Sequence, residues 1–251
     1  MAGSQTGAVI QVRALALVPE FEEAVRLQQE IWGFDEIELL PVRLFVVASK
    51  VGGQAFGAFD DGRMIAFLLA IPGIRDGRHY LHSHMLGVLP EYRDRGVGRM
   101  LKLEQRNDAL ARGISLVEWT FDPLELKNAF FNIERLGAIM RRDHANQYGA
   151  TSSHLHGGLP TDRLVAEWHV SGPRAQTILA GRPFQRPLAE SRVSVPSDIA
   201  SIRAAYPARA RGIQREIGNR FQDAFARGFA VVGFERSTEA GTYLIGPWES
   251  E

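Results

Sequence analysis

The 251-residue sequence contains no cysteine. Disulfide bonds, thiolate nucleophiles and cysteine-based zinc sites are therefore excluded. The sequence also lacks an excess of charge of either sign, because 29 Lys and Arg residues balance 29 Asp and Glu residues. No global field then attracts nucleic acid or an anionic membrane, so any site for an anion must be local.

Long apolar runs are missing as well, since no apolar stretch approaches the roughly 18 residues that span a bilayer. The first residues, MAGSQTGAVIQV, lack the basic start and the unbroken apolar core of a signal peptide. We therefore expect a cytoplasmic protein that binds neither nucleic acid nor membrane. Its 45% hydrophobic and 23% charged residues are an ordinary globular composition.

The pattern of apolar residues predicts strands and helices over the first part of the chain. Asp60-Asp61-Gly62 between two apolar runs is a strong signal for a β-hairpin. The predicted strands cover residues 8–15, 54–74 (the hairpin), 78–89 and 114–122, and the predicted helices cover residues 18–33, 40–53, 96–113 and 123–138. This order indicates an α/β protein with a mixed sheet and helices on its faces.

Beyond residue 150 the patterns are weaker. They predict a strand at 162–170, a connection containing Pro and Arg at 182–198, a helix at 207–228 and a terminal hairpin at 229–248. The helix carries Arg215 and Arg220 besides its apolar face. Such arginines usually contact solvent; the alternative is that they bind an anionic acceptor or a neighbouring subunit, which leaves a homodimer open.

The stretch LPEYRDRGVGRML, residues 89–101, gathers arginines around two glycines between a predicted strand and a predicted helix. Such a turn can bind phosphate, because glycine lets the backbone approach closely and N–H groups converge at the helix N-terminus. A P-loop is excluded, since Gly98 is followed by Arg99 and Met100 rather than by Lys and Ser or Thr. A dinucleotide-binding fingerprint is excluded because its third glycine would be Leu101.

A third pattern fits, because Arg93-Asp94-Arg95-Gly96-Val97-Gly98 has the form R/Q-x-x-G-x-G/A. With the strand before it and the helix after it, this motif closely resembles the coenzyme-A-binding motif of the GNAT superfamily of acyl-CoA-dependent acyltransferases. The resemblance covers residues 8–150, and GLPTDRLVAEW at 158–168 resembles a long branch of that superfamily. It implies a GNAT-like, mainly antiparallel sheet flanked by helices. The implied domains are an acyl-CoA-binding core at 1–150 and a helix-plus-hairpin extension at 151–251, packed on the core.

The same resemblance implies coenzyme A or acetyl-CoA as a cosubstrate, with its pyrophosphate held by backbone N–H groups of the turn. Asn128 and Asn132 lie on the helix that lines the cofactor in this family, although the polar face of an amphipathic helix explains them equally well. The implied cofactor-binding residues are Leu86, Gly87, Val88, Arg93, Asp94, Arg95, Gly96, Val97, Gly98, Arg99, Asn128 and Asn132. No metal is expected.

Acyl transfer to an amine calls for a base, because an alkylamine with a pKa near 10 is only about one part in a thousand neutral at pH 7. In the family the base, when present, often comes from the strand before the phosphate turn. His82 and His84 share one face of that strand, and His84 is preferred because it lies nearer the turn. The alternative is that one histidine is packed and the other faces solvent. Glu118 is a further candidate, as base or acceptor-binding residue, on the strand that splays to admit the pantetheine arm in the family.

The family's usual acid is a tyrosine four residues before the glycine that ends the following helix, where it protonates the departing thiolate. Counting back from Gly137 gives Ile133, so the expected tyrosine is missing. Asn132 and Tyr148 could replace it by position, and Tyr148 could equally be an aromatic residue at the rim of the site. The predicted catalytic set is His84, Glu118 and Tyr148.

Three functions follow from these residues. The first is an N-acyltransferase that moves an acyl group, acetyl first of all, from coenzyme A to an amine of a small molecule or peptide by direct attack. The missing tyrosine favours a second function, a protein that binds and senses acyl-CoA without turnover. Acyl transfer to an oxygen acceptor is a third, which no residue excludes.

Overall fold

The computed structural model describes residues 9–149 and 158–248. The chain forms two compact units, Met1–Ile114 and Ser115–Glu251. The strand pairings described within each unit are antiparallel, and helices accompany the strands in both. The predicted α/β class with mainly antiparallel strands is therefore confirmed. The division expected at residue 150 stays a prediction.

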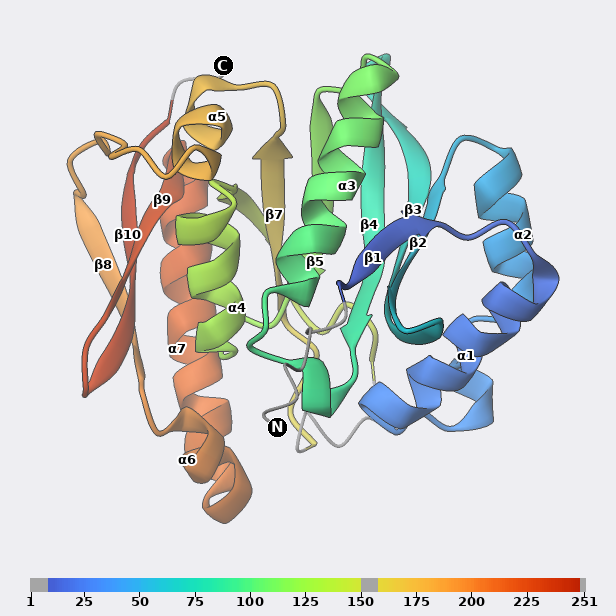
Figure 1. Ribbon diagram of the computed structural model, residues 1–251. Coiled ribbons are helices and arrows are strands. Elements are labelled where there is room, and N and C mark those ends of the chain that lie inside the picture. Colours follow the sequence, from blue (N-terminus) through green and yellow to red (C-terminus); the bar gives the residue numbers. More distant parts are fainter. Residues whose placement is uncertain (1–8, 150–157, 249–251) are drawn as a thin grey trace, which may run out of the picture. The chain divides into compact units, whose positions relative to one another are not determined.

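The described part of the first unit contains four strands, in the order β1-β2-β3-β4, and three α-helices (Figure 1). The strands are β1 (Gln11–Ala14), β2 (Gln54–Asp60), β3 (Arg63–Arg75) and β4 (Arg78–Val88). The helices are α1 (Val18–Trp32), α2 (Val42–Lys50) and α3 (Val97–Ala111), with short 3-10 turns at Glu36–Glu38 and Pro90–Tyr92. All of the helices and strands predicted up to residue 113 are confirmed.

Local signals explain why these elements begin and end where they do. Asp61 and Gly62 both have positive φ, at 46° and 79°, which suits a two-residue turn whose twist matches that of β2 and β3. Helix α1 ends at Gly33, which adopts the left-handed conformation and donates its N–H to Gln29 O at 2.8 Å. The turn chemistry of the sequence therefore fixes the ends of these elements.

Helices cover both faces of the β3–β4 hairpin. A Cβ atom built on Gly87 would lie 2.7 Å from Trp32 of α1, whereas one built on Gly98 of α3 would lie 3.6 Å from Leu86 and 3.9 Å from Val88. Because successive strand residues point to opposite faces, α1 lies on the face opposite to α3. Gly87 is thus explained by the close approach of α1 to the strand.

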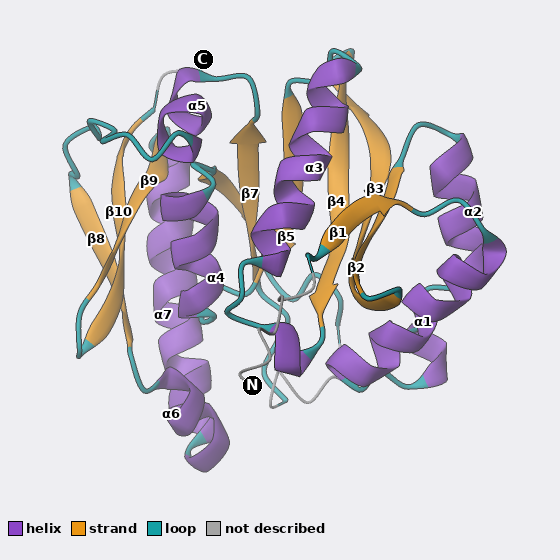
Figure 2. Ribbon diagram, viewed as in Figure 1, coloured by secondary structure: helices purple, strands orange, loops and turns teal. Residues whose placement is uncertain are grey.

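The described part of the second unit contains six strands in the order β5-β7-β6-β9-β10-β8, and Figure 2 shows them with their helices. The strands are β5 (Leu116–Phe121), β6 (Ile139–His144), β7 (Arg163–His169), β8 (Ser191–Pro196), β9 (Phe229–Arg236) and β10 (Ala240–Pro247). The helices are α4 (Leu126–Phe130), α5 (Pro173–Leu179), α6 (Ile199–Ala205) and α7 (Pro207–Ala226). Strand β7 pairs with both β5 and β6, so the chain after residue 150 completes the sheet that precedes it.

Several predictions for the second unit need correction. The connection expected at 182–198 contains β8, in which only Val193 and Val195 are buried, so the apolar signal is short. The single helix expected at 123–138 is instead the short α-helix α4 followed by a π-helix at Phe131–Arg135. In the π-helix, Leu136 N donates to Phe131 O at 3.1 Å. The terminal hairpin and the long helix α7 are confirmed.

Candidate functional site

The glycine turn is anchored to the hairpin that precedes it. Leu89 N donates to Ile65 O at 3.0 Å, and the Tyr92 hydroxyl donates to Asp60 Oδ2 at 2.6 Å. Beyond these anchors the backbone turns sharply, because Asp94 and Gly96 have φ values of 60° and 82°. Positive φ favours glycine, so the residue at 96 is explained by backbone geometry.

Helix α3 starts at this turn without a side-chain cap. Its first described intrahelical hydrogen bond runs from Met100 N to Gly96 O at 3.0 Å. The N–H groups of Val97 and Gly98 therefore have no acceptor within the helix, and they lie at the positive end of its dipole. This end of α3 can accept an anion.

The predicted cofactor-binding residues of the first unit gather at this place. Leu86 and Val88 lie against the backbone of Gly98, at ordinary contact distance from the position its Cβ would take. The side chains of Arg93 and Arg95 are exposed, and the guanidinium of Arg95 lies 5.1 Å from the centre of the Tyr92 ring. Arg93 Nε donates to the carbonyl oxygen of Val88 at 3.3 Å, which ties the turn to the end of β4.

Strand β4 carries a β-bulge at His84. The β3–β4 register passes from Leu69↔Met85 to Ala70↔Ser83, so His84 is the extra residue. Bulges of this kind re-aim side chains and occur often beside active sites. The rings of His82 and His84 are 5.7 Å apart, and burial lowers the pKa of His84 below its ordinary value. This shift favours the neutral imidazole, which is the form that a general base requires.

Beneath the bulge lies a buried lysine that the sequence analysis did not single out. Lys102 Nζ of α3 donates to Ser83 Oγ at 3.0 Å and to Gln105 Oε1 at 2.9 Å. Lys102 is 3% exposed, and its burial lowers the pKa of the amine well below the usual range. The feature of the sequence that could have identified Lys102 is its position one helical turn after Gly98, among the buried residues of α3.

Glu118 of β5 is held in a cluster of charges. Its carboxylate accepts a hydrogen bond from Arg142 Nη2 at 2.6 Å, and Arg142 Nε donates to Glu167 Oε1 at 3.1 Å. A bulge in β6 makes Arg141 the extra residue, and Arg141 also donates to Glu167. The two carboxylates are both buried and lie opposite each other in register, so the arginines offset their repulsion. This pairing gives Glu118 a structural explanation, and a role as base stays a prediction.

The remaining predicted site residues lie in the second unit. The Tyr148 hydroxyl is 3.1 Å from Thr120 Oγ1, and the guanidinium of Arg163 lies 5.4 Å from the centre of the Tyr148 ring. Asn128 is exposed on α4, whereas Asn132 is 4% exposed within the π-helix. Ile133, at the position where the resemblance expects a tyrosine, is fully buried within the π-helix.

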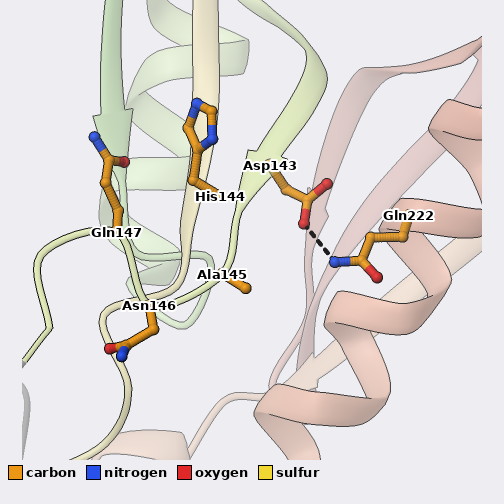
Figure 3. Close-up of a pocket in the computed structure, with 6 residues that line it drawn as sticks. All are labelled: Asp143, His144, Ala145, Asn146, Gln147 and Gln222. Carbon is orange, nitrogen blue, oxygen red and sulfur yellow. Dashed lines mark hydrogen bonds between the residues drawn. The ribbon is translucent and has the colours of Figure 1, made fainter.

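A polar hollow of about 520 Å³ opens beside the end of β6 (Figure 3). Its lining residues are Asp143, His144, Ala145, Asn146, Gln147 and Gln222. No residue of this lining was predicted, because its members come from a loop and from a helix far along the chain. Asp143 Oδ2 accepts a hydrogen bond from Gln222 Nε2 at 2.9 Å across the hollow (Figure 3).

Two further findings concern only residues 9–149 and 158–248. Among them, no group of three or more His, Cys, Asp and Glu residues is placed to hold a metal ion. None of the helices formed by these residues is both long and apolar enough to cross a bilayer.

Known structures share this fold. The ribosomal-protein-S18-alanine N-acetyltransferase from Escherichia coli is 16% identical, with a TM-score of 0.52 over 65% of this chain and 96% of that chain. FeeM, an N-acyl amino acid synthase from uncultured soil microbes, is 14% identical, with a TM-score of 0.52 over 69% and 98%. NAA60 from Arabidopsis thaliana is 16% identical, with a TM-score of 0.50 over 64% and 97%. At these identities the likeness shows the fold alone. None of the curated proteins matches the sequence.

The fold and the turn define the class of this protein. It is an α/β protein in which a strand is followed by a glycine turn and then by a helix without a side-chain cap. Residues 18–137 match the model of the acetyltransferase (GNAT) family. This part of the chain therefore belongs to the GNAT acetyltransferase family, and the resemblance drawn from the turn is confirmed.

Proposed function

We propose that the protein transfers an acyl group, acetyl in the first instance, from coenzyme A to an amine of a small molecule or peptide. The observation that carries the proposal is the uncapped start of α3 at the motif Arg93–Gly98, in a chain with a GNAT domain. The proposal includes a cytoplasmic location.

The turn would bind the pyrophosphate of coenzyme A through main-chain N–H groups between Arg95 and Arg99. Gly98 supports this assignment, because a Cβ there would meet only ordinary contacts, the nearest at 3.6 Å. Glycine in a helix costs up to about 1 kcal/mol relative to alanine, and packing does not require it at this position. Close approach of a ligand to the backbone explains the glycine better. Asn128 and Asn132 would line the cofactor, as the resemblance implies.

His84 would accept the proton of the attacking amine, directly or through water. Deprotonation of an alkylamine with a pKa near 10 costs roughly 4 kcal/mol at pH 7, because the pKa and the pH differ by about three units. A neutral imidazole held at a β-bulge can offset part of this free-energy cost by accepting the proton. N–H groups at the Val88 end of β4 would polarise the thioester carbonyl as the amine attacks it directly.

Tyr148 would protonate the departing thiolate in place of the missing tyrosine. Its hydroxyl is within hydrogen-bond distance of Thr120, and its side chain is 46% exposed, so that a ligand can reach it.

The experiment is a panel of acyl-CoA thioesters and acceptors scored by release of free thiol. An N-acyltransferase gives thiol release only with amines present, and inclusion of alcohols tests transfer to oxygen. The fully buried Ile133, where an acid is expected, favours the alternative of an acyl-CoA-binding protein without turnover. That protein would bind coenzyme A but release no thiol with any acceptor.

A further inference from the structure

The β-bulge in β4 reverses the alternation of side chains along this strand. Leu86, which follows the bulge, faces α3, because it lies 3.6 Å from the position that a Cβ on Gly98 would take. In a regular strand the next residues on that face would be His84 and His82. The extra residue shifts the register, so Ser83 faces α3 in their place. The bulge therefore determines where the two histidines point.

Ser83 belongs to a row of residues that crosses three strands of the first unit. Gln54 of β2 pairs with Ala70 of β3, and Ala70 pairs with Ser83 of β4. Residues that pair directly across strands carry their side chains on the same face of the sheet. The shift of register in β3–β4 lies between Leu69 and Ala70, so this row is the one next to the bulge.

Two side chains of α3 bind both ends of the row. Lys102 Nζ donates to Ser83 Oγ at 3.0 Å and to Gln105 Oε1 at 2.9 Å. Gln105 Nε2 donates to Gln54 Oε1 at 2.9 Å, and Gln54 Nε2 donates to the carbonyl oxygen of Gln105 at 3.0 Å. All four side chains are buried. The residue that precedes His84 is therefore tied through α3 to β2.

A lysine at this buried position needs a physical reason. Burial of its amine costs free energy that an apolar side chain would not lose. The best-attested benefit of a buried polar group is that it specifies register, because only one arrangement satisfies its hydrogen bonds. Without the extra residue in β4, His84 would stand opposite Ala70. Ser83 would then turn to the other face, and its hydrogen bond to Lys102 would be lost.

We propose that Lys102 is a positioning residue, which holds the β-bulge by binding Ser83 and thereby keeps His84 in place. Each contact in this argument lies within the first unit. The proposal rests on the proposed function only for the role of His84 as the base.

The first measurement is the pattern of nuclear Overhauser effects between β3 and β4 in the full chain. In the wild type we expect effects between Ala70 and Ser83. Lys102→Met removes the donor and Ser83→Ala removes the acceptor, so in both variants these effects should weaken and effects between Ala70 and His84 should appear. Ser83→Thr keeps a hydroxyl and should keep the wild-type pattern. Leu110→Ala, at a half-buried position later in α3, is the control for loss of packing and should also keep it.

The second measurement is thiol release from acetyl-CoA with the best amine of the panel. Lys102→Met and Ser83→Ala should each lower kcat about tenfold, because a displaced base no longer meets the reacting atoms in the right geometry. The affinity for coenzyme A should not change, since the turn before Gly98 is intact. The double variant should be no slower than either single variant, because both remove the same hydrogen bond.

Three results would overturn the proposal: wild-type Overhauser effects between Ala70 and Ser83 in the variants, wild-type kcat in a variant whose effects have changed, or additive losses in the double variant. Circular dichroism identifies a variant that fails to fold, and Ser83→Ala, the smaller change, then decides the outcome. A wild-type chain that releases no thiol with any amine would contradict the proposed function instead. The Overhauser effects would still show whether Lys102 holds the bulge, so the two failures are distinguishable.

Discussion

The turn at Arg93–Gly98 and the hollow at Asp143–Gln147 are opposite in chemical character. The turn presents backbone donors at the start of α3, with exposed arginines around it, whereas the hollow is lined by one carboxylate, Asp143, and by amide side chains. A chain with a formal net charge of zero thus carries one place rich in positive groups and another that holds a carboxylate. Net charge alone predicts neither, because both arise from local geometry.

The largest expected effect comes from placing a negatively charged side chain in the turn, where backbone N–H groups act as donors. Gly98→Glu should weaken coenzyme A binding at least about 100-fold, because a carboxylate would face the pyrophosphate. The fold should survive, since the nearest atom to a Cβ at this position is 3.6 Å away. Calorimetry measures the affinity, and Gly98→Ala, which keeps the motif, is the matched control. Unchanged coenzyme A affinity in Gly98→Glu would falsify the cofactor assignment.

The comparison also predicts that the two places respond independently. Asp143→Asn in the hollow should leave coenzyme A binding unchanged when the affinity is measured by the same calorimetry.

His84 gives the next largest effect. His84→Ala should lower turnover roughly 100-fold, the lower end of what general base catalysis contributes. Burial lowers the pKa of His84, so the wild-type base is lost only as the pH falls through a value below 6.5. The difference between the two proteins should therefore shrink at lower pH, where the wild type lacks its base as well. A pH–rate profile parallel to that of the wild type would remove His84 from the mechanism.

The two units also differ in how they bury charge, and Arg142→Met tests the paired case. Removal of one partner of a buried ion pair costs about 3–5 kcal/mol, because the other charge stays buried. We expect about 2 kcal/mol in urea unfolding, since the Arg142 side chain is 35% exposed while Glu118 is 3% exposed. A variant as stable as the wild type would show that the carboxylates do not depend on this arginine.

Lys102→Met tests the buried amine of the first unit, and its expected effect is a change in how stability depends on pH. The pKa of Lys102 is lowered in the folded state, so between that pKa and the ordinary 10.5 the unfolded chain binds the extra proton. Stability of the wild type should therefore rise with pH in this window, by at most about 1.4 kcal/mol per pH unit. The variant should lack this slope in urea unfolding at pH 7 and pH 9.5. Identical slopes in the two proteins would contradict a neutral buried amine.

The sequence predicted those features that local chemistry determines. The hairpin at Asp61-Gly62, the end of α1 at Gly33 and the glycine turn each depend on residues with restricted backbone preferences, and each was confirmed. Strand β8 and the seven-residue helices α5 and α6 escaped because their apolar patterns are too short for periodicity to show.

The charge clusters were missed for a different reason. Arg141 reaches Glu167 only because a bulge in β6 adds a residue, and Gln222 meets Asp143 only through tertiary packing. No spacing within the sequence encodes these contacts, so only the structure reveals them.

The most direct test of the central claim is a titration of coenzyme A into the ¹⁵N-labelled protein, followed by amide chemical shifts. Binding through the turn predicts saturable shifts of the Val97 and Gly98 amides, because these N–H groups would then donate to the pyrophosphate. Saturable shifts elsewhere, with these two amides unmoved, would contradict it.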